Sequence, residues 1–214
     1  MSRIAIIDYG MGNLRSVEKA VEHVATGCRI VVTSDPREVA AADRVVFPGQ
    51  GAMPDCMREL EARGVRDAVV AAAASKPFLG ICIGEQMLFE RSEEGDVSGL
   101  GILPGRVVRF PDAASMKTAD GGHLKVPHMG WNEVTQLDPT HSLWAGIDDG
   151  ERFYFVHSYY VVPADDALRA AETTYGPRFT SAVGRDNIFA VQFHPEKSAG
   201  AGLQLLANFV RWKP

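Results

Sequence analysis

The sequence predicts an α/β fold with a mostly parallel central sheet, helices on both of its faces, and additional antiparallel strands. Two observations carry this prediction. Between residues 3 and 95, continuous apolar strand patterns alternate with helical patterns, which is typical of a parallel sheet covered on both faces. From residue 96 onward, short β-type runs follow one another between Pro, Gly and Asp, which indicates antiparallel strands.

The first elements are defined by apolar spacing. A buried strand is expected at 3–8, and the helix expected at 13–25 has its apolar residues on one face. The β-rich run 28–33 is the second strand. The helix at 34–42 opens with Ser-Asp-Pro, a helix-start signal, and 44–48 is the third strand.

Two further helices are expected at 55–64 and 65–75, the first of them closed by a glycine. A fourth strand at 76–81 leads into a helix at 84–95, which another glycine ends. Alternation of this kind places the carboxyl ends of the strands along one edge of the sheet, where open α/β sheets bind ligands.

The second half contains β-type runs without long helices between them. The expected strands are RVVRF (106–110), HLKVPHMGW (123–131), RFYFVHSYYVV (152–162), LRAAETTY (168–175), FTSAVG (179–184) and IFAVQFH (188–194). An amphipathic helix closes the chain at 201–212. With no repeat and no linker, residues 1–214 are expected to form one domain.

Composition and charge exclude several classes of function. The net charge of −5 in 214 residues provides no basic surface for nucleic acid or anionic membranes. The longest apolar run, 68–74, is too short to span a membrane, and the first residues form a strand pattern rather than a signal peptide. Three cysteines without metal-ligand spacing favour a reducing, cytoplasmic location.

Cys82 lies in G-I-C-I-G, where the fourth strand meets a helix. This arrangement matches the nucleophile elbow, with sulfur in place of the hydroxyl. Gly80 and Gly84 would leave room for the tight turn, and the following helix N-terminus would favour a thiolate. The alternative is a small buried hydrophobe, which is the role expected of Cys28 and Cys56.

A thiol nucleophile needs a base, and His194 is the histidine best placed to be one. It ends the run IFAVQF and is followed by Pro195 and Glu196. Because proline keeps the chain extended, Glu196 is expected on the same side as His194, where it would orient the imidazole. The alternative is a hydrogen-bonded core histidine. No motif for a metal or a cofactor is present.

The third element is the glycine loop FPGQGAMP, which follows the third strand. Gly49 and Gly51 would expose backbone N–H groups that complete an oxyanion hole next to Cys82. The loop YGMGN after the first strand does not fit a dinucleotide fingerprint, because Arg15 stands where the third glycine is needed.

Together, the ordered motifs PGQGAM, LGICIGEQM and FHPEKS resemble those of the class I, triad-type glutamine amidotransferases, whose domain is flavodoxin-like. The stretches IDYGMGNLRSV, KVPHMGWN and YFVHSYY narrow the resemblance to the glutaminase subunits of imidazole glycerol phosphate synthase in histidine biosynthesis. The resemblance covers essentially the whole chain. It implies that Cys82 attacks the amide of glutamine, that His194 moves the proton, and that Glu196 orients the histidine.

The resemblance also implies the roles of the residues around the nucleophile. The N–H groups of Gln50 or Gly51 and of Ile83 would form the oxyanion hole. Gln86 would hold the α-amino-acid end of the substrate, Glu94 would pair with its ammonium, and Gly49 would line the substrate site.

A cyclase subunit with a (β/α)₈ barrel is the implied partner, in a heterodimer that channels ammonia and activates the glutaminase. Asn13, Trp131, Tyr159 and Lys197 are the expected interface residues. Alternatives are an amidotransferase for another acceptor, a stand-alone γ-glutamyl hydrolase, and a non-enzymatic module. Two residues depart from the family pattern, which usually has apolar side chains at these positions: Gln50 in the oxyanion loop and Glu85 after the nucleophile.

Overall fold

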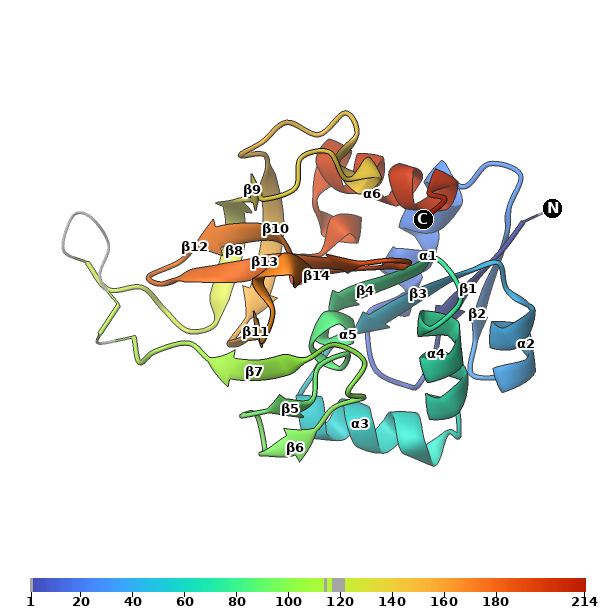
Figure 1. Cartoon of the computed structure of the whole chain (residues 1–214), viewed down its shortest axis with the longest axis horizontal. Coiled ribbons are helices and arrows are strands. Elements are labelled where there is room, and N and C mark those ends of the chain that lie inside the picture. The colour runs from blue at the N-terminus through green and yellow to red at the C-terminus, as the bar shows by residue number, and fades with distance from the viewer. Residues whose placement is uncertain (1, 114, 117–121) are drawn as a thin grey trace.

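A computed structural model describes residues 2–113, 115–116 and 122–214, and its backbone is arranged around a sheet of 12 strands (Figure 1). One half of this sheet is parallel, in the order β2-β1-β3-β4-β14. These strands are β1 (Arg3–Ile7), β2 (Arg29–Thr33), β3 (Arg44–Gly49), β4 (Phe78–Cys82) and β14 (Ile188–Val191). The predicted parallel sheet is therefore confirmed.

The other half of the sheet is mainly antiparallel, as predicted, and continues from β14 through β13, β11 and β7 to β5 and β6. Strands β12 and β9 pair beside β13, and β8 pairs with β10 in a separate two-stranded sheet. Their bounds are β5 (Arg91–Ser92), β6 (Val97–Ser98), β7 (Gly105–Arg109), β8 (His128–Glu133), β9 (Thr135–Gln136), β10 (Arg152–His157), β11 (Tyr159–Pro163), β12 (Arg169–Thr174) and β13 (Arg178–Arg185).

Helices cover both faces of the parallel half (Figure 1). Helices α1 and α6 pack against each other on one face, while α3 and α4 lie on the other, where α2 contacts α4. The helices are α1 (Leu14–Val24), α2 (Pro36–Ala41), α3 (Met53–Ala62), α4 (Arg66–Ala73), α5 (Ile83–Gln86) and α6 (Ala199–Arg211), with short 3₁₀ turns η1 (Ser142–Trp144), η2 (Asp166–Leu168) and η3 (Pro195–Lys197). Within the described residues, no helix combines the length and hydrophobicity that crossing a membrane requires.

The prediction for the last strand covers only one of its two neighbours. The run 188–194 was expected to be antiparallel, and β14 does pair antiparallel with β13, but it also inserts beside β4 and runs parallel to that strand. The reason is the β13–β14 hairpin, which reverses the chain once more beside the parallel sheet. As a consequence, β4 and β14 end side by side at the same edge, and the residues that follow them meet.

The helix predicted at 84–95 is wrong beyond Gln86, because α5 ends at Gln86 and β5 begins at Arg91. The carbonyl groups of residues 87–90 do not continue a helix. They accept hydrogen bonds from the N–H groups of residues 99–103. Three consecutive apolar side chains, at 87–89, are fully buried. A surface helix would expose at least one of them, so burial of this segment favours the irregular loop.

Candidate active site

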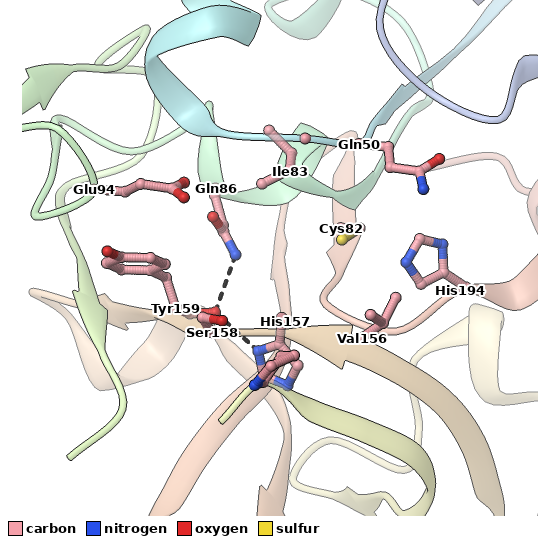
Figure 2. A pocket seen from close by; sticks show the side chains of 12 residues that line it. Gln50, Cys82, Ile83, Gln86, Glu94, Val156, His157, Ser158, Tyr159 and His194 are labelled. Carbon is pink, nitrogen blue, oxygen red and sulfur yellow. Dashed lines mark hydrogen bonds between the residues drawn. The ribbon is translucent and has the colours of Figure 1, made fainter. Parts of the chain in front are cut away.

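A cavity of about 250 Å³ opens at the carboxyl ends of β3, β4 and β14 (Figure 2). Figure 2 shows Cys82 near its middle, His194 on one side, and Gln86 and Glu94 toward the other. Most of the predicted site residues line it: Gln50, Gly51, Cys82, Ile83, Gln86, Glu94, Tyr159 and His194.

Cys82 forms the sharp strand-to-helix turn that the sequence predicts. Its backbone has φ 57° and ψ −113°, a conformation that costs a non-glycine residue roughly 1–3 kcal/mol. A Cβ at Gly84 would collide with the carbonyl oxygen of Phe47, and one at Gly80 would lie 2.9 Å from the Cβ of Ala190. The turn therefore excludes side chains at both glycines. Because α5 is only one turn long, its dipole contributes little, contrary to the expectation.

His194 and Glu196 form a buried pair. Nδ1 of His194 lies 2.8 Å from Oε1 of Glu196, and the two side chains are 5% and 2% exposed. The His194 backbone is fixed as well, because its N–H donates to the Tyr154 carbonyl and its own carbonyl accepts from the Ser198 hydroxyl. Glu196 lies on the same side as His194, as expected, but the 3₁₀ turn η3 (Pro195–Lys197) brings it there rather than the extended chain that the H-P-E pattern predicted.

The other ring nitrogen of His194, Nε2, is buried and makes no hydrogen bond within the described residues. Figure 2 shows the ring beside the Cys82 sulfur. Burial alone would lower the pKa of His194, but the charge of the Cys82 sulfur and the Glu196 carboxylate raise that pKa from 6.5 to about 10. An imidazolium next to the cysteine is therefore the favoured state at neutral pH.

The glycine loop lies directly against the turn at Cys82, since Gly49 pairs with Cys82 in the β3–β4 register. Two contacts hold the loop. The Cys56 thiol donates to the Gln50 carbonyl oxygen at 3.6 Å. Gly51 has φ 113°, and a Cβ added to it would lie 2.8 Å from the methyl carbon of Met11, so the Met11 side chain packs against this glycine. Cys56 was expected only to pack, yet burial raises its pKa to about 11 and keeps it as a hydrogen-bond donor.

Gln86 reaches from α5 toward the far wall of the cavity. Its amide nitrogen donates to the Tyr159 carbonyl at 3.1 Å and to Oε1 of Gln192 at 2.8 Å. Its own oxygen, Oε1, is buried without a partner among the described residues. Because Gln86 lines the cavity, this oxygen is available to an N–H group of a ligand.

Sequence reasoning missed Gln192, which is fully buried and whose amide donates to the Cys82 sulfur at 3.6 Å. A signal was present: Gln192 stands two residues before His194, on the same side of an extended chain. Glu94 also has a second contact that was not expected. Its Oε2 accepts from the Met53 N–H at 2.8 Å, which ties this end of the cavity to the start of α3, and burial raises the pKa of Glu94.

The family comparison agrees with this geometry. Residues 5–212 match the model of the class-I glutamine amidotransferases. The curated relative "Imidazole glycerol phosphate synthase subunit HisH" of Aromatoleum aromaticum is 75% identical over 214 residues, which cover 100% of both chains. The chain belongs to the HisH family of class-I glutamine amidotransferases. It is therefore a glutamine amidotransferase. The HisH subunit of Dechloromonas aromatica is 70% identical and covers 99% of this chain and 97% of its own.

Solved structures share the fold of this HisH-family chain at much lower identity. The structure of PurLQS from Thermotoga maritima has a TM-score of 0.70 at 16% identity, covering 98% of each chain. A second solved structure, described as a glutamine amidotransferase, has a TM-score of 0.69 at 16% identity, covering 97% of each chain. At this identity the likeness concerns the fold alone, and it confirms the predicted architecture.

The residues expected at the partner interface do not all meet in this HisH-family chain. Trp131 is 47% exposed, and its ring lies 6.2 Å from that of Tyr154, over which the Lys197 ammonium lies at 5.9 Å. Tyr159 lines the cavity instead. Asn13 is exposed at the start of α1, a helix that contacts η3.

Of the two departures from the family pattern, Gln50 is exposed at the cavity, whereas Glu85 is fully buried. Both carboxyl oxygens of Glu85 lack hydrogen-bond partners among the described residues. Burial and the nearby Cys82 raise the pKa of Glu85 well above 4.5, so it is carried as a neutral acid. Within the described part of the chain, no three His, Cys, Asp or Glu side chains are grouped to hold a metal ion.

Proposed function

We propose that this chain is the glutaminase subunit of imidazole glycerol phosphate synthase in histidine biosynthesis. It hydrolyses glutamine to glutamate and ammonia, and the ammonia is used for the synthesis of imidazole glycerol phosphate and aminoimidazole carboxamide ribotide. The full-length identity to HisH subunits supports the assignment. The observation that carries the mechanism is the buried His194–Glu196 pair facing the Cys82 sulfur.

In the first half-reaction, the Cys82 thiolate attacks the side-chain amide carbon of glutamine, and a carbon–sulfur bond forms. The protonated Nε2 of His194 then gives its proton to the amide nitrogen as the carbon–nitrogen bond breaks. Ammonia leaves, and a glutamyl thioester remains on Cys82. Glu196 stabilises the imidazolium through Nδ1 and keeps the ring in the orientation that donates from Nε2.

In the second half-reaction, water attacks the thioester carbon while Nε2 of His194 removes a proton from it. The carbon–sulfur bond breaks, glutamate leaves, and the Cys82 thiolate with the His194 imidazolium is restored.

The negative oxygen that forms in both half-reactions needs hydrogen-bond donors. The N–H groups of Ile83 and of Gln50 or Gly51 fill this role, because both segments border the Cys82 sulfur in the cavity. The absence of a side chain at Gly49 allows the loop to approach the nucleophile turn closely.

The α-amino-acid end of glutamine lies toward Gln86 and Glu94. The unpaired Oε1 of Gln86 accepts from the substrate ammonium, and Glu94 adds the opposite charge. This assignment accounts for a buried acceptor that otherwise lacks a partner among the described residues.

The partner is a cyclase subunit with a (β/α)₈ barrel, and the two subunits form a heterodimer. Trp131 and Lys197, grouped around Tyr154, supply a central aromatic and a charged contact, and Asn13 and Tyr159 extend the interface. Glutamine turnover is low until the partner binds its own ligand. Residues 1–214 act as one domain, and the three free cysteines are consistent with the cytoplasm.

The test is Cys82→Ser in the complex with the cyclase, measured with glutamine and separately with ammonium as the nitrogen source. Glutamine-dependent synthesis should disappear while ammonium-dependent synthesis is unchanged. Cys28→Ser is the matched control, since Cys28 is also a free thiol but does not line the cavity. Full glutamine-dependent activity in Cys82→Ser would refute the mechanism.

A further inference from the structure

Two buried histidines next to the cavity take no part in the proposed chemistry. His128 of β8 stands opposite His157 of β10, and they are 2% and 6% exposed. Nδ1 of His128 lies 2.9 Å from Nε2 of His157. When two buried histidine rings are in direct contact, one nitrogen must donate the hydrogen bond and the other must accept it.

The surrounding groups fix which nitrogen carries the proton. Nδ1 of His157 lies 2.8 Å from the Tyr159 carbonyl, which can only accept, so this nitrogen must carry hydrogen. Nε2 of a neutral His157 is then an acceptor, and Nδ1 of His128 must donate to it. Nε2 of His128 accepts in turn from the Asn132 amide at 3.3 Å, whose other hydrogen goes to the Thr174 carbonyl at 3.0 Å.

Both rings are neutral over the working range of the protein. Burial lowers the pKa of His128 to about 4, and burial together with His128 lowers the pKa of His157 to about 3. Aromatic rings enclose the pair: His128 stacks between Phe155 and Tyr175, with ring centroids 4.8 Å and 4.0 Å away. The direction of the hydrogen bonds is therefore the same throughout this range.

The chain of hydrogen bonds continues to the cavity through the Tyr159 carbonyl. This oxygen accepts both from His157 and from the Gln86 amide, which uses its two available lone pairs. The Gln86 nitrogen also donates to Gln192, so both of its hydrogens are used, and the Gln86 oxygen is left without a partner among the described residues. Were the proton of His157 on Nε2, a lone pair of Nδ1 would face the Tyr159 carbonyl and repel it.

We propose that His128 and His157 are positioning residues: the His157 N–H holds the Tyr159 carbonyl in place, this carbonyl anchors the Gln86 amide nitrogen, and the Gln86 oxygen is thereby left for the substrate ammonium. The inference rests on the proposed function, because it takes glutamine as the ligand of that oxygen. Its consequence is selectivity: the site prefers glutamine to glutaramate, the same amide without the α-amino group.

The experiment compares His157→Leu with His157→Asn in the complex with the cyclase. The two side chains have similar size, but only Asn keeps an N–H near the Nδ1 position for the Tyr159 carbonyl. In His157→Leu, KM for glutamine should rise about tenfold with kcat changed by less than about threefold, and the preference for glutamine over glutaramate should fall about tenfold. His157→Asn should keep the preference to within about threefold.

A purely packing role predicts the opposite order, because Leu replaces buried apolar volume better than Asn. Wild-type preference in a folded His157→Leu, or an equal loss in both variants, would overturn the proposal. His23→Leu, on the exposed side of α1, is the control. If wild-type protein shows no Cys82-dependent glutaminase activity, the proposed function itself fails, which separates the two cases.

A second measurement needs no variant and decides the matter even if His157→Leu does not fold. Nitrogen NMR of the ring-labelled wild-type protein should show both His128 and His157 with hydrogen on Nδ1, unchanged between about pH 6 and 9. Free neutral histidine prefers hydrogen on Nε2. Finding that form in His157 would overturn the proposal.

Discussion

Replacing Glu196 by Gln tests the part of the site that the electrostatics define most sharply. The change keeps size and an acceptor oxygen 2.8 Å from Nδ1 of His194, but it removes a charge from a pair whose side chains are 5% and 2% exposed. Hydrogen bonds to charged groups contribute about 1.5–3 kcal/mol, and near-complete burial places this one at the upper end. A loss of about 3 kcal/mol corresponds to roughly a 100-fold fall in kcat/KM.

The same change lowers the pKa of His194, because Glu196 accepts the Nδ1 hydrogen bond and supplies an opposite charge, although the Cys82 sulfur contributes more to the raised pKa. The pKa of His194 is about 10 in the folded protein and 6.5 when the ring is exposed, so protonation of His194 stabilises the folded state. The contribution of His194 is fully present below about pH 6.5 and is lost as the pH rises toward 10. In Glu196→Gln, this loss should be complete at a lower pH.

The assay is glutamate release by the complex with the cyclase and its ligand, from about pH 6 to 10, with unfolding followed over the same range. Glu22→Gln is the matched control, since Glu22 also pairs with a cation, Lys19 at 2.7 Å, but on the exposed surface. The control should change kcat/KM by less than about twofold. A Glu196→Gln variant with the wild-type rate and pH profile would refute the role assigned to the pair.

Three further substitutions test other parts of the structure. Glu85→Met should raise the free energy of unfolding at pH 7 by roughly 1–3 kcal/mol in denaturant titrations. Because the pKa of Glu85 is raised in the folded protein, this gain should shrink toward pH 4. An equal gain at pH 7 and pH 4 would contradict the neutral buried acid. Gly84→Ala should lower the free energy of unfolding by roughly 1–3 kcal/mol, since its Cβ meets the Phe47 carbonyl, and a neutral effect would count against the tight turn. Trp131→Ala should weaken binding of the cyclase about tenfold in calorimetry while leaving the fold intact, whereas Leu137→Ala, another exposed apolar residue, should not.

The parallel half of the fold was predictable because its central strands are buried on both faces. Such strands are continuous apolar runs, so a strand was expected at 44–48, where β3 is Arg44–Gly49 and is buried at five of six residues. The apolar face of the helix expected at 13–25 likewise predicted α1 (Leu14–Val24). The signal at the start of α2 was equally local: the Asp35 side chain accepts from the Arg37 N–H, with Pro36 in the first turn.

The features that the sequence did not predict depend on contacts between distant segments. The segment after Gln86 has a helical composition, but its carbonyls bond with residues 99–103, which no local pattern reveals. The antiparallel pairing of β14 with β13 was expected, but its parallel pairing with β4 depends on a choice of neighbour that its own residues do not encode.

The candidate site shows the same division. Cys82, His194 and Glu196 carry local signals, namely a glycine-flanked turn and an H-P-E sequence. Gln192 and the pair of buried histidines depend on which strands become neighbours, so they emerged only from the structure.

The most direct test of the account is to look for the covalent intermediate on Cys82. The complex would be mixed with glutamine, quenched in acid after a fraction of a turnover, and analysed by mass spectrometry of its peptides. We expect one glutamyl group, attached through a thioester to the peptide that contains Cys82 and removed by neutral hydroxylamine. Glutamine turnover without any such adduct, or with the adduct on Cys28 or Cys56, would contradict it.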